Sequence, residues 1–113
     1  VLEPIKSAVI STKDYDGMFC NFCINYDGQD DITEACKMVT RKVLTGKLQV
    51  HDITTALIKE NVYSSFFLPP DRMILLDGRQ TTDGFLLWDS AKTHVEYVEQ
   101  SWMDWKIDLA KQL

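Results

Sequence analysis

Two short apolar runs constrain the fold of this chain more than any other feature of its sequence. MFCNFCI (18–24) and RMILL (72–76) are apolar almost throughout, and both are too short for helices of ordinary length. Apolar runs without alternation are typical of strands that are covered on both faces. A third segment, HVEYV (94–98), has the composition of a further strand. The sequence therefore predicts an α/β fold with a mostly parallel sheet flanked by helices.

Helix signals lie between these runs. Pro4 suits the first turn of a helix that we expect to end near Lys13. Asp31 and Glu34 have the spacing of a capping box, which predicts a helix that begins there and ends before Gly46. Apolar residues at helical intervals indicate the face that this helix buries: Ile32, Ala35, Cys36, Val39 and Val43.

Two further helices are expected nearer the carboxyl end. One follows Asp52 with Ile53, Ala56 and Leu57 facing inward, and the other begins near residue 101 with apolar residues on one face: Trp102, Trp105 and Leu109. No repeat, low-complexity tract or linker interrupts the sequence, so we expect residues 1–113 to form a single domain. Two or three parallel strands make a thin core, which indicates that neighbouring sequence or another subunit completes the sheet.

The acidic charge of the chain argues against nucleic-acid binding. The formal net charge is −5, whereas a protein that follows a phosphate backbone needs a basic face. No apolar run approaches the length of a transmembrane segment, and the opening VLEPIKSAV lacks a signal-peptide pattern.

The cysteines do not predict a metal or redox site. Cys20 and Cys23 have CxxC spacing, but no second pair of ligands accompanies them in the sequence. His51 and His94 are isolated, and no recognisable motif places a nucleophile beside either of them. We therefore expect all the cysteines to be small buried hydrophobes in a reduced compartment.

The acidic turn DGQDD (27–31) does not match a calcium loop. Such a loop needs a glutamate at its twelfth position, and counting from Asp27 places Met38 there. The turn is instead expected to lead into a helix, whose dipole favours carboxylates in the first turn. The sequence predicts no metal site and no cofactor in this chain.

LLDGRQTTDGFLLW (75–88) is the segment most typical of a binding site. It reads as a strand end, a polar loop and an apolar cluster, and loops at the carboxyl ends of strands in α/β sheets commonly bind phosphates. Gly78 and Gly84 bracket the loop and permit unusual backbone angles. Trp88 and Trp102 are expected in core or interface packing.

Three segments occur in an order that is typical of one enzyme family. NFCINYDGQDDITEA (21–35) is similar to N-Y-G-G-R-x-[DE]-I-x-x-A, and LPPDRMILLDG (68–78) is similar to L-P-x-P-D-L-[LV]-I-R-T-x-G. GFLLWDSAKTHVEYVEQSWMDW (84–105) is similar to N-F-L-L-W-Q-x-A-Y-x-E-x-Y-F ending in W-P-[DE]-F. The chain thus resembles the cis-prenyltransferases, the family of undecaprenyl and dehydrodolichyl diphosphate synthases. The resemblance implies that residues 1–113 form the carboxyl-terminal half of a cis-prenyltransferase-like domain.

This resemblance implies a diphosphate site that has lost its ligands. The family condenses isopentenyl diphosphate onto an allylic diphosphate, and its second half holds isopentenyl diphosphate with two arginines and a serine. A diphosphate requires cationic, fork-shaped donors. Here Leu75 and Thr81 occupy the places of the two arginines, and Asp83 occupies the place of the serine. Arg79 stands where the family has a glutamate, so the implied substrate-binding loop consists of Arg79, Thr81 and Asp83.

Further positions depart from the family pattern. His94 replaces a glutamate that the family ties to its metal site, and Asp27 and Gln29 replace glycine and arginine in the turn before the first matched helix. No catalytic residue is therefore predicted, and magnesium is expected only if the family activity is retained.

Degenerate members of this family, such as Nogo-B-receptor-like subunits, pair with a catalytic chain. TTDGFLLW (81–88) is similar to their equivalent stretch, which implies that this chain associates with a like-folded chain, as a homo- or heterodimer, in polyprenyl diphosphate and dolichol synthesis. The implied place of action is the cytoplasm or the cytoplasmic face of a membrane. The residues expected at the interface or in packing are Phe85, Leu86, Trp88, Tyr97 and Trp102.

Three alternatives stay open at this point. A diverged active prenyltransferase would hold the diphosphate with Arg79 and Thr81 in a rearranged loop, once an amino-terminal half is present. A diverged enzyme for another ligand would use His94 with Asp83. An interaction domain would have lost the chemistry altogether.

Overall fold

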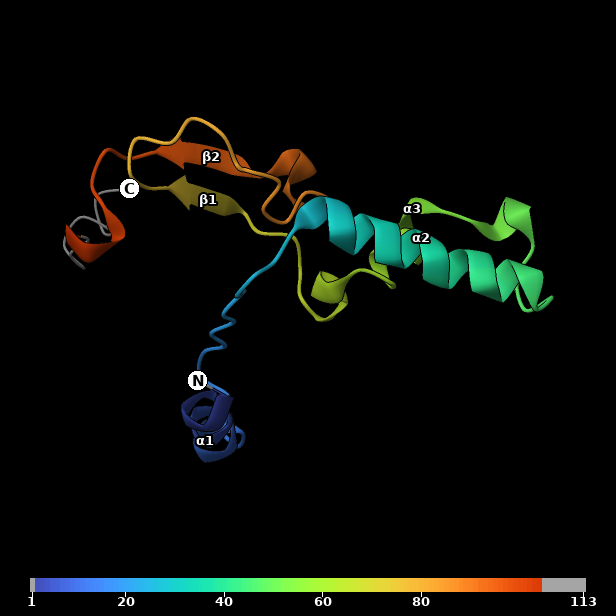
Figure 1. Ribbon diagram of the computed structural model, residues 1–113, viewed down its shortest axis with the longest axis horizontal. Coiled ribbons are helices and arrows are strands. Elements are labelled where there is room, and N and C mark those ends of the chain that lie inside the picture. Colours follow the sequence, from blue (N-terminus) through green and yellow to red (C-terminus); the bar gives the residue numbers. More distant parts are fainter. Residues whose placement is uncertain (1, 105–113) are drawn as a thin grey trace.

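The chain folds into two parallel strands with helices at one end of them (Figure 1). The computed structural model describes residues 2–104. The elements in chain order, with η marking 3₁₀ turns, are α1 (Leu2–Thr12), α2 (Gly28–Leu44), η1 (Val50–Asp52), α3 (Thr55–Lys59), η2 (Tyr63–Phe66), β1 (Arg72–Leu75), η3 (Asp89–Lys92), β2 (His94–Tyr97) and η4 (Trp102–Asp104). The closing helix is described only as far as η4, and its predicted residues Trp105 and Leu109 lie outside the described residues.

The predicted parallel pairing is confirmed for two of the three runs. β1 and β2 lie in parallel register, with Arg72 opposite His94 and Leu75 opposite Tyr97. The backbone N–H of Val98 donates to the carbonyl of Leu75 at 2.8 Å, so the pairing continues one residue past β2. The fold is therefore α/β with a small parallel sheet, as the sequence predicts.

The third predicted strand is not formed. Residues 18–24 have no regular secondary structure and run as an open segment from α1 to α2 (Figure 1). Among residues 2–104, no backbone hydrogen bond joins this segment to another one. The prediction was wrong because a strand needs a neighbouring strand to pair with, and neither β1 nor β2 takes that place.

The prediction of core cysteines was also wrong. Cys20, Cys23 and Cys36 are all free and exposed. The first two lie in the open segment, where nothing covers them. Cys36 lies on the outer side of α2, because the buried face of that helix follows the spacing of Ala35 and Val39.

The helix α2 begins before the predicted capping box. Its N-cap is Asp27, whose carboxylate accepts hydrogen bonds from the backbone N–H groups of Gln29 at 2.7 Å and Asp30 at 3.2 Å. Asp31 lies inside the helix and is 2% exposed, so it cannot act as the cap. The end of the helix agrees with the prediction, since Gly46 follows it in the left-handed region with a φ of 69°.

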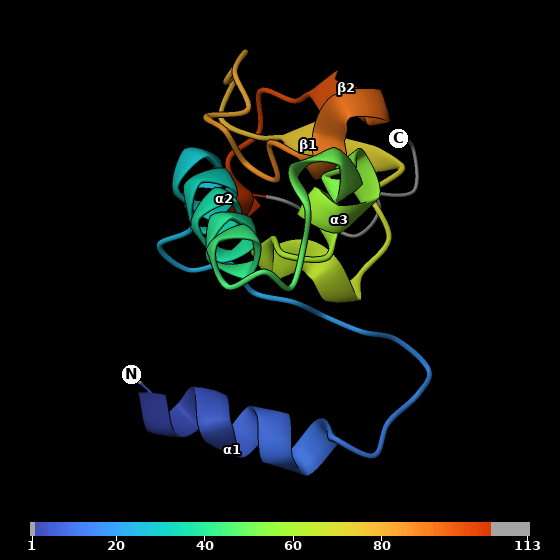
Figure 2. The same cartoon turned by 90° about the vertical axis from the view of Figure 1, so that its right-hand side faces the viewer.

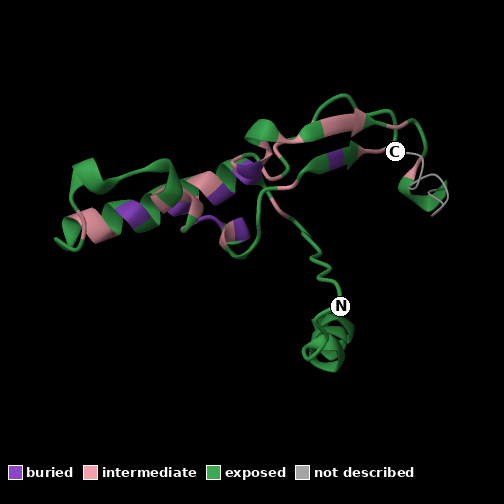
Figure 3. Ribbon diagram, turned by 180° about the vertical axis from the view of Figure 1, so that it is seen from behind, coloured by how far each residue is buried: buried purple, intermediate pink, exposed green. Residues whose placement is uncertain are grey.

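The core is small and does not include α1. The buried apolar residues of the described chain are Ala35, Val39, Val62 and Met73. α1 has the predicted position, but none of its residues is buried, and it lies apart from the other elements in two orientations (Figures 2 and 3).

In α3 only part of the predicted inward face is covered, because Leu57 is half-buried while Ile53 and Ala56 are exposed. Among residues 2–104, no helix combines the length and the apolar character that crossing a bilayer requires.

The buried carboxylate of Asp31 connects three segments. Its Oδ2 accepts a hydrogen bond from the hydroxyl of Tyr26, and its Oδ1 accepts one from the backbone N–H of Tyr63, both at 2.8 Å. Because each oxygen has a donor, the cost of burying this charge is largely offset. Asp31 thereby joins the turn before α2 to the start of η2.

The start of α2 touches the loop after β1 at two glycines. A Cβ atom at Gly28 would lie 2.0 Å from the carbonyl oxygen of Gly84 and 2.7 Å from the Cβ of Leu87. Only a residue without a side chain fits at position 28. Gly84 has a φ of 77°, which also favours glycine.

We predict that Gly28→Ala destabilises the fold by about 1–3 kcal/mol, as expected when a side chain is forced into a filled space. The measurement is urea unfolding followed by tryptophan fluorescence. Gly17→Ala is the matched control, because no atom lies within 4 Å of the Cβ that it would add. If both variants unfold at the same urea concentration, the Gly28–Gly84 contact can accommodate a methyl group without loss of stability.

Candidate functional site

The loop 76–84 follows β1 and is held against the segment that follows β2. The backbone N–H of Asp77 donates to the carbonyl of Gln100 at 3.0 Å, and that of Gly78 donates to the carbonyl of Val98 at 3.1 Å. Asp77 and Gly78 both have left-handed backbone angles, with φ of 61° and 65°. The loop therefore starts at the carboxyl end of β1, where α/β folds usually bind ligands.

The three residues predicted for this loop form one cluster. The Nη1 of Arg79 donates to Oδ2 of Asp83 at 2.8 Å, and the hydroxyl of Thr81 donates to Oδ1 of Asp83 at 3.1 Å. The backbone N–H of Asp83 in turn donates to the Thr81 hydroxyl at 3.1 Å. The carboxylate therefore takes hydrogen bonds from both side chains that could face a phosphate.

The cluster lies on the surface. The side chains of Arg79 and Asp83 are 64% and 55% exposed. Leu75, which the resemblance places at the family's first arginine, is the last residue of β1 and is half-buried. The loop thus presents one guanidinium, already paired, beside a carboxylate. The loop 76–84 also contains Asp77, so its formal charge is −1, whereas a diphosphate site needs a clear excess of cations.

An aromatic pair fixes the apolar end of the loop. The rings of Tyr26 and Phe85 meet edge to face, with centroids 5.7 Å apart and planes 81° apart. Burial of the Tyr26 phenol raises its pKa, and its hydrogen bond to the Asp31 carboxylate raises this pKa further. Leu86 follows with a φ of 47°, which is rare for a leucine and holds the backbone in a sharp turn before Trp88.

The predicted interface residues divide into an exposed group and a covered group. Phe85, Tyr97 and Trp102 are 39%, 55% and 71% exposed. Leu86 and Trp88 are half-buried and contribute to packing within the chain. The structure thus leaves three large aromatic side chains accessible near the loop and the end of β2.

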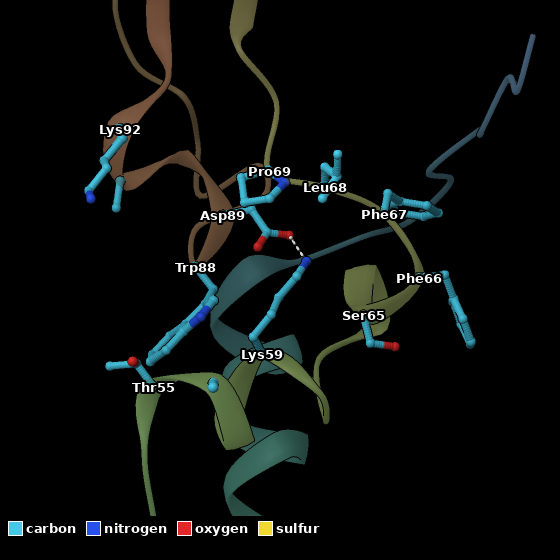
Figure 4. Close-up of a pocket in the computed structure, with 12 residues that line it drawn as sticks. Thr55, Lys59, Ser65, Phe66, Phe67, Leu68, Pro69, Trp88, Asp89 and Lys92 are labelled. Carbon is cyan, nitrogen blue, oxygen red and sulfur yellow. Dashed lines mark hydrogen bonds and ion pairs between the residues drawn. The ribbon is translucent and has the colours of Figure 1, made fainter.

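A buried polar cluster formed by Lys59, Ser64 and Asp89 was not predicted from the sequence. The Nζ of Lys59 donates to Oδ2 of Asp89 at 2.7 Å (Figure 4). It also donates to the carbonyl of Ser64 at 2.7 Å. The Ser64 hydroxyl donates to the same Asp89 oxygen. The one sequence signal for this cluster was Asp89, a carboxylate directly after the apolar FLLW stretch. Its cationic partner Lys59 is 30 residues away in the sequence, so the pair could not be predicted.

Lys59 and Asp89 of this cluster line a pocket of about 660 Å³. Its walls come from α3, from residues 65–69 and from η3, and Figure 4 shows Lys59 between Trp88 on one side and Phe67 on the other. Oδ1 of Asp89 has no hydrogen-bond partner among the described residues, but it is fully covered and so cannot meet a ligand in the pocket. Ser64 is 4% exposed and donates to a carboxylate, an arrangement that stabilises packing rather than a nucleophile.

The structure does not bring His94 and Asp83 together as a polar pair. The Nε2 of His94 lies 3.6 Å from Oε1 of Glu96, which also accepts from Arg72 on β1, whereas Asp83 is held by Arg79 and Thr81. Within residues 2–104, no cluster of three or more His, Cys, Asp or Glu side chains is arranged to hold a metal ion.

Comparisons with known proteins agree with this architecture. A family model described as "Putative undecaprenyl diphosphate synthase" matches residues 1–113. The isoprenyl transferase of Bacillus subtilis (strain 168) is 32% identical over 107 residues, which are 95% of this chain and 41% of that protein. A tritrans,polycis-undecaprenyl-diphosphate synthase (geranylgeranyl-diphosphate specific) of Methanocaldococcus jannaschii is 33% identical over 104 residues, 90% of this chain and 37% of that protein.

A solved structure gives the same result for the fold. The crystal structure of lavandulyl diphosphate synthase from Lavandula x intermedia, in complex with dimethylallyl diphosphate, matches with a TM-score of 0.88 and 26% identity. The match covers 97% of this chain and 48% of that chain. The chain belongs to the cis-prenyltransferase family, and it spans about two fifths of the length of the curated relatives that it matches. It therefore carries a part of the family's fold.

We predict that Tyr26→Phe reduces the loss of stability at high pH. The pKa of the Tyr26 phenol is raised in the folded chain. The phenol therefore contributes fully to the free energy of unfolding below its ordinary pKa of about 10, and this contribution is lost as pH rises above that value. The measurement is the free energy of unfolding in urea at about pH 9 and about pH 11. The variant should be less stable than the parent at the lower pH, where it lacks the hydrogen bond to Asp31, and the difference should shrink at the higher pH. A constant difference would contradict the raised pKa.

Proposed function

We propose that this chain is a catalytically degenerate cis-prenyltransferase-like subunit or fragment, which acts by association with a like-folded chain in polyprenyl diphosphate synthesis. The family and the fold support the first part of this proposal, because the relatives named above are prenyl diphosphate synthases or isoprenyl transferases. The state of the loop after β1 supports the second part. In this proposal the chain has no catalytic residue of its own.

The carboxylate of Asp83 is the observation that carries the proposal. It pairs with Arg79 at 2.8 Å in an exposed position. An exposed ion pair of this kind contributes at most about 1 kcal/mol, so a diphosphate could displace the carboxylate from Arg79. The Asp83 carboxylate would nevertheless stay in the loop. It would then lie beside two phosphates without a positive charge of its own to pair with. The repulsion opposes binding even though one arginine is available.

The two missing arginines weaken binding further. Leu75 and Thr81 stand in their places and supply no positive charge. A hydrogen bond to a charged group contributes about 1.5–3 kcal/mol, so the loss of two amounts to roughly 3–6 kcal/mol. That range corresponds to a factor of about 10² to 10⁴ in affinity. The loop is therefore a weak candidate for a productive isopentenyl diphosphate site.

Accessible aromatic side chains support the proposed association. Tyr97 ends β2, Trp102 begins η4 a few residues later, and both are more than half exposed. Large aromatic residues commonly provide the strongest contacts of protein interfaces, since they bury much area with few rotatable bonds. Together with Phe85, they are the residues to which we assign contact with the like-folded chain.

We predict no measurable turnover when the purified chain is given isopentenyl diphosphate, farnesyl diphosphate and magnesium. Titration calorimetry should likewise detect no binding of isopentenyl diphosphate. Turnover by the chain alone would refute the proposal that the site is degenerate, and would favour a diverged enzyme that uses Arg79.

A repaired loop provides the matched control for this experiment. Leu75→Arg combined with Thr81→Arg and Asp83→Ser restores the charges that the family uses, and should raise the affinity for isopentenyl diphosphate by about 10² or more. Arg79→Ala in the unrepaired chain should change nothing measurable. If the repaired loop binds no better than the parent, the missing charges are not what limits binding.

We predict that Trp102→Glu weakens self-association of the purified chain by about tenfold or more, because the substitution removes an aromatic contact and buries an unpaired charge. The measurement is sedimentation velocity over a range of concentrations. Phe66→Glu is the control, since Phe66 is 89% exposed but lies in η2 outside the assigned interface. A parent chain that stays monomeric at every concentration would contradict a homodimer.

A further inference from the structure

A second concave site lies at the amino ends of the two strands. The pocket of about 660 Å³ described above is bounded by residues 65–69, which precede β1, and by η3, which precedes β2. The loop 76–84 follows β1, so it belongs to the opposite end of the same parallel pair. None of the three exposed aromatic residues assigned to the association lines this pocket. It is therefore separate from both surfaces that the proposed function uses.

The walls of this pocket are mostly hydrocarbon. Trp88 lies on one side and Phe67 on the other, with the side chain of Lys59 between them (Figure 4). Leu68 and Pro69 add further apolar surface. The methylene stem of Lys59 contributes as well, because its ammonium group is held in the polar cluster. Volume and lining are those of a small-molecule site, and the body of its ligand must be apolar.

The ammonium group of Lys59 is not free to bind a ligand. Its Nζ donates to the carbonyl of Ser64 at 2.7 Å, to the Ser64 hydroxyl at 3.3 Å and to Oδ2 of Asp89 at 2.7 Å. An ammonium group has three donors, and these contacts use all of them. Lys59 and Asp89 thus form a closed pair that offers a ligand no charge.

Lys92 supplies the charge that the pocket does offer. In the part of the chain that the structure describes, Lys92 is the one further charged residue in the lining, and its side chain has no ion pair or hydrogen bond there. Figure 4 shows it on the Trp88 side of the pocket. A phosphate monoester carries nearly two negative charges at neutral pH, whereas a carboxylate carries one and matches a single ammonium group. The polar end of the ligand is therefore a carboxylate.

We propose that this pocket binds a medium-chain fatty acid, with the carboxylate on Lys92 and the aliphatic chain lying along Trp88 and the stem of Lys59 towards Phe67. This inference goes beyond the proposed function, because it concerns another site and another class of ligand. It holds whether or not the loop after β1 is active.

The test is an NMR titration of the isotope-labelled chain with decanoate. Backbone amide signals of α3, of residues 65–69 and of η3 should shift and reach saturation, whereas those of α1 and of the loop 76–84 should stay in place. Another apolar cavity, of about 750 Å³, lies between α1 and residues 15–22. Shifts confined to that region would place the acid there and overturn the inference.

Two substitutions test the charge and the space separately. Lys92→Glu should weaken decanoate binding by about tenfold or more, because it replaces an attraction with a repulsion. Lys47→Glu is the matched control, since Lys47 is also exposed but lies outside the pocket, and it should bind like the parent. Ala91→Phe should abolish binding, because it places a ring in the space that the chain of the acid needs. Ala91 is exposed, so the fold does not depend on it.

A second probe checks the sign of the charge. Decylammonium has an aliphatic chain of the same length and the opposite charge, and should bind at least about tenfold more weakly than decanoate. The inference is overturned if decanoate does not bind, if Lys92→Glu or Ala91→Phe binds it like the parent, or if decylammonium binds equally well. An equal loss of affinity in Lys92→Glu and Lys47→Glu would also overturn it. None of these outcomes changes the turnover or Trp102→Glu experiments.

Discussion

The hydrogen bonds of the buried Asp31 carboxylate organise the body of this chain. One oxygen accepts from Tyr26 and the other from the backbone of Tyr63, so a single charged group sets the turn before α2 relative to η2. Tyr26 in turn packs against Phe85, which ends the polar loop after β1. With only four buried apolar residues in the described chain, these polar and aromatic contacts have a larger share in the fold than they would in a bigger core.

In the function proposed for this chain, the loop after β1 has lost its ligand and kept its shape. Its backbone geometry is held by hydrogen bonds to Val98 and Gln100 and by left-handed angles at Asp77 and Gly78, none of which depends on a phosphate. The side chains that would contact a phosphate are few and interact with one another. Fold and chemistry are thus determined by different residues, and the chemistry can change while the fold stays.

The sequence predicted local features well and non-local ones poorly. The apolar run 72–76 and the strand-like segment 94–98 identified the two strands observed among residues 2–104, and Gly46 marked the end of α2, because these signals depend on neighbouring residues alone. The run 18–24 was wrongly predicted as a strand, since pairing depends on a partner that its own residues cannot reveal.

The cap at Asp27 was missed for a related reason. Asp31 matches the capping pattern, but it is buried and accepts a hydrogen bond from Tyr63, 32 residues away. The Lys59–Asp89 pair could not be predicted either, because its two residues lie 30 positions apart in the sequence. The family was recognised from three motifs in order, and the comparisons confirm it, whereas the loss of the phosphate ligands stays a prediction that depends on three named positions.

The contact between Gly28 and Gly84 limits how the loop could be redesigned. Because the carbonyl of Gly84 leaves no room for any side chain at position 28, the end of the loop and the beginning of α2 are fixed relative to each other. Residues 79–81, by contrast, are exposed and stand clear of that contact. A protein engineer could therefore exchange these positions to recognise another anion, while an insertion that moved Gly84 would displace the whole helix.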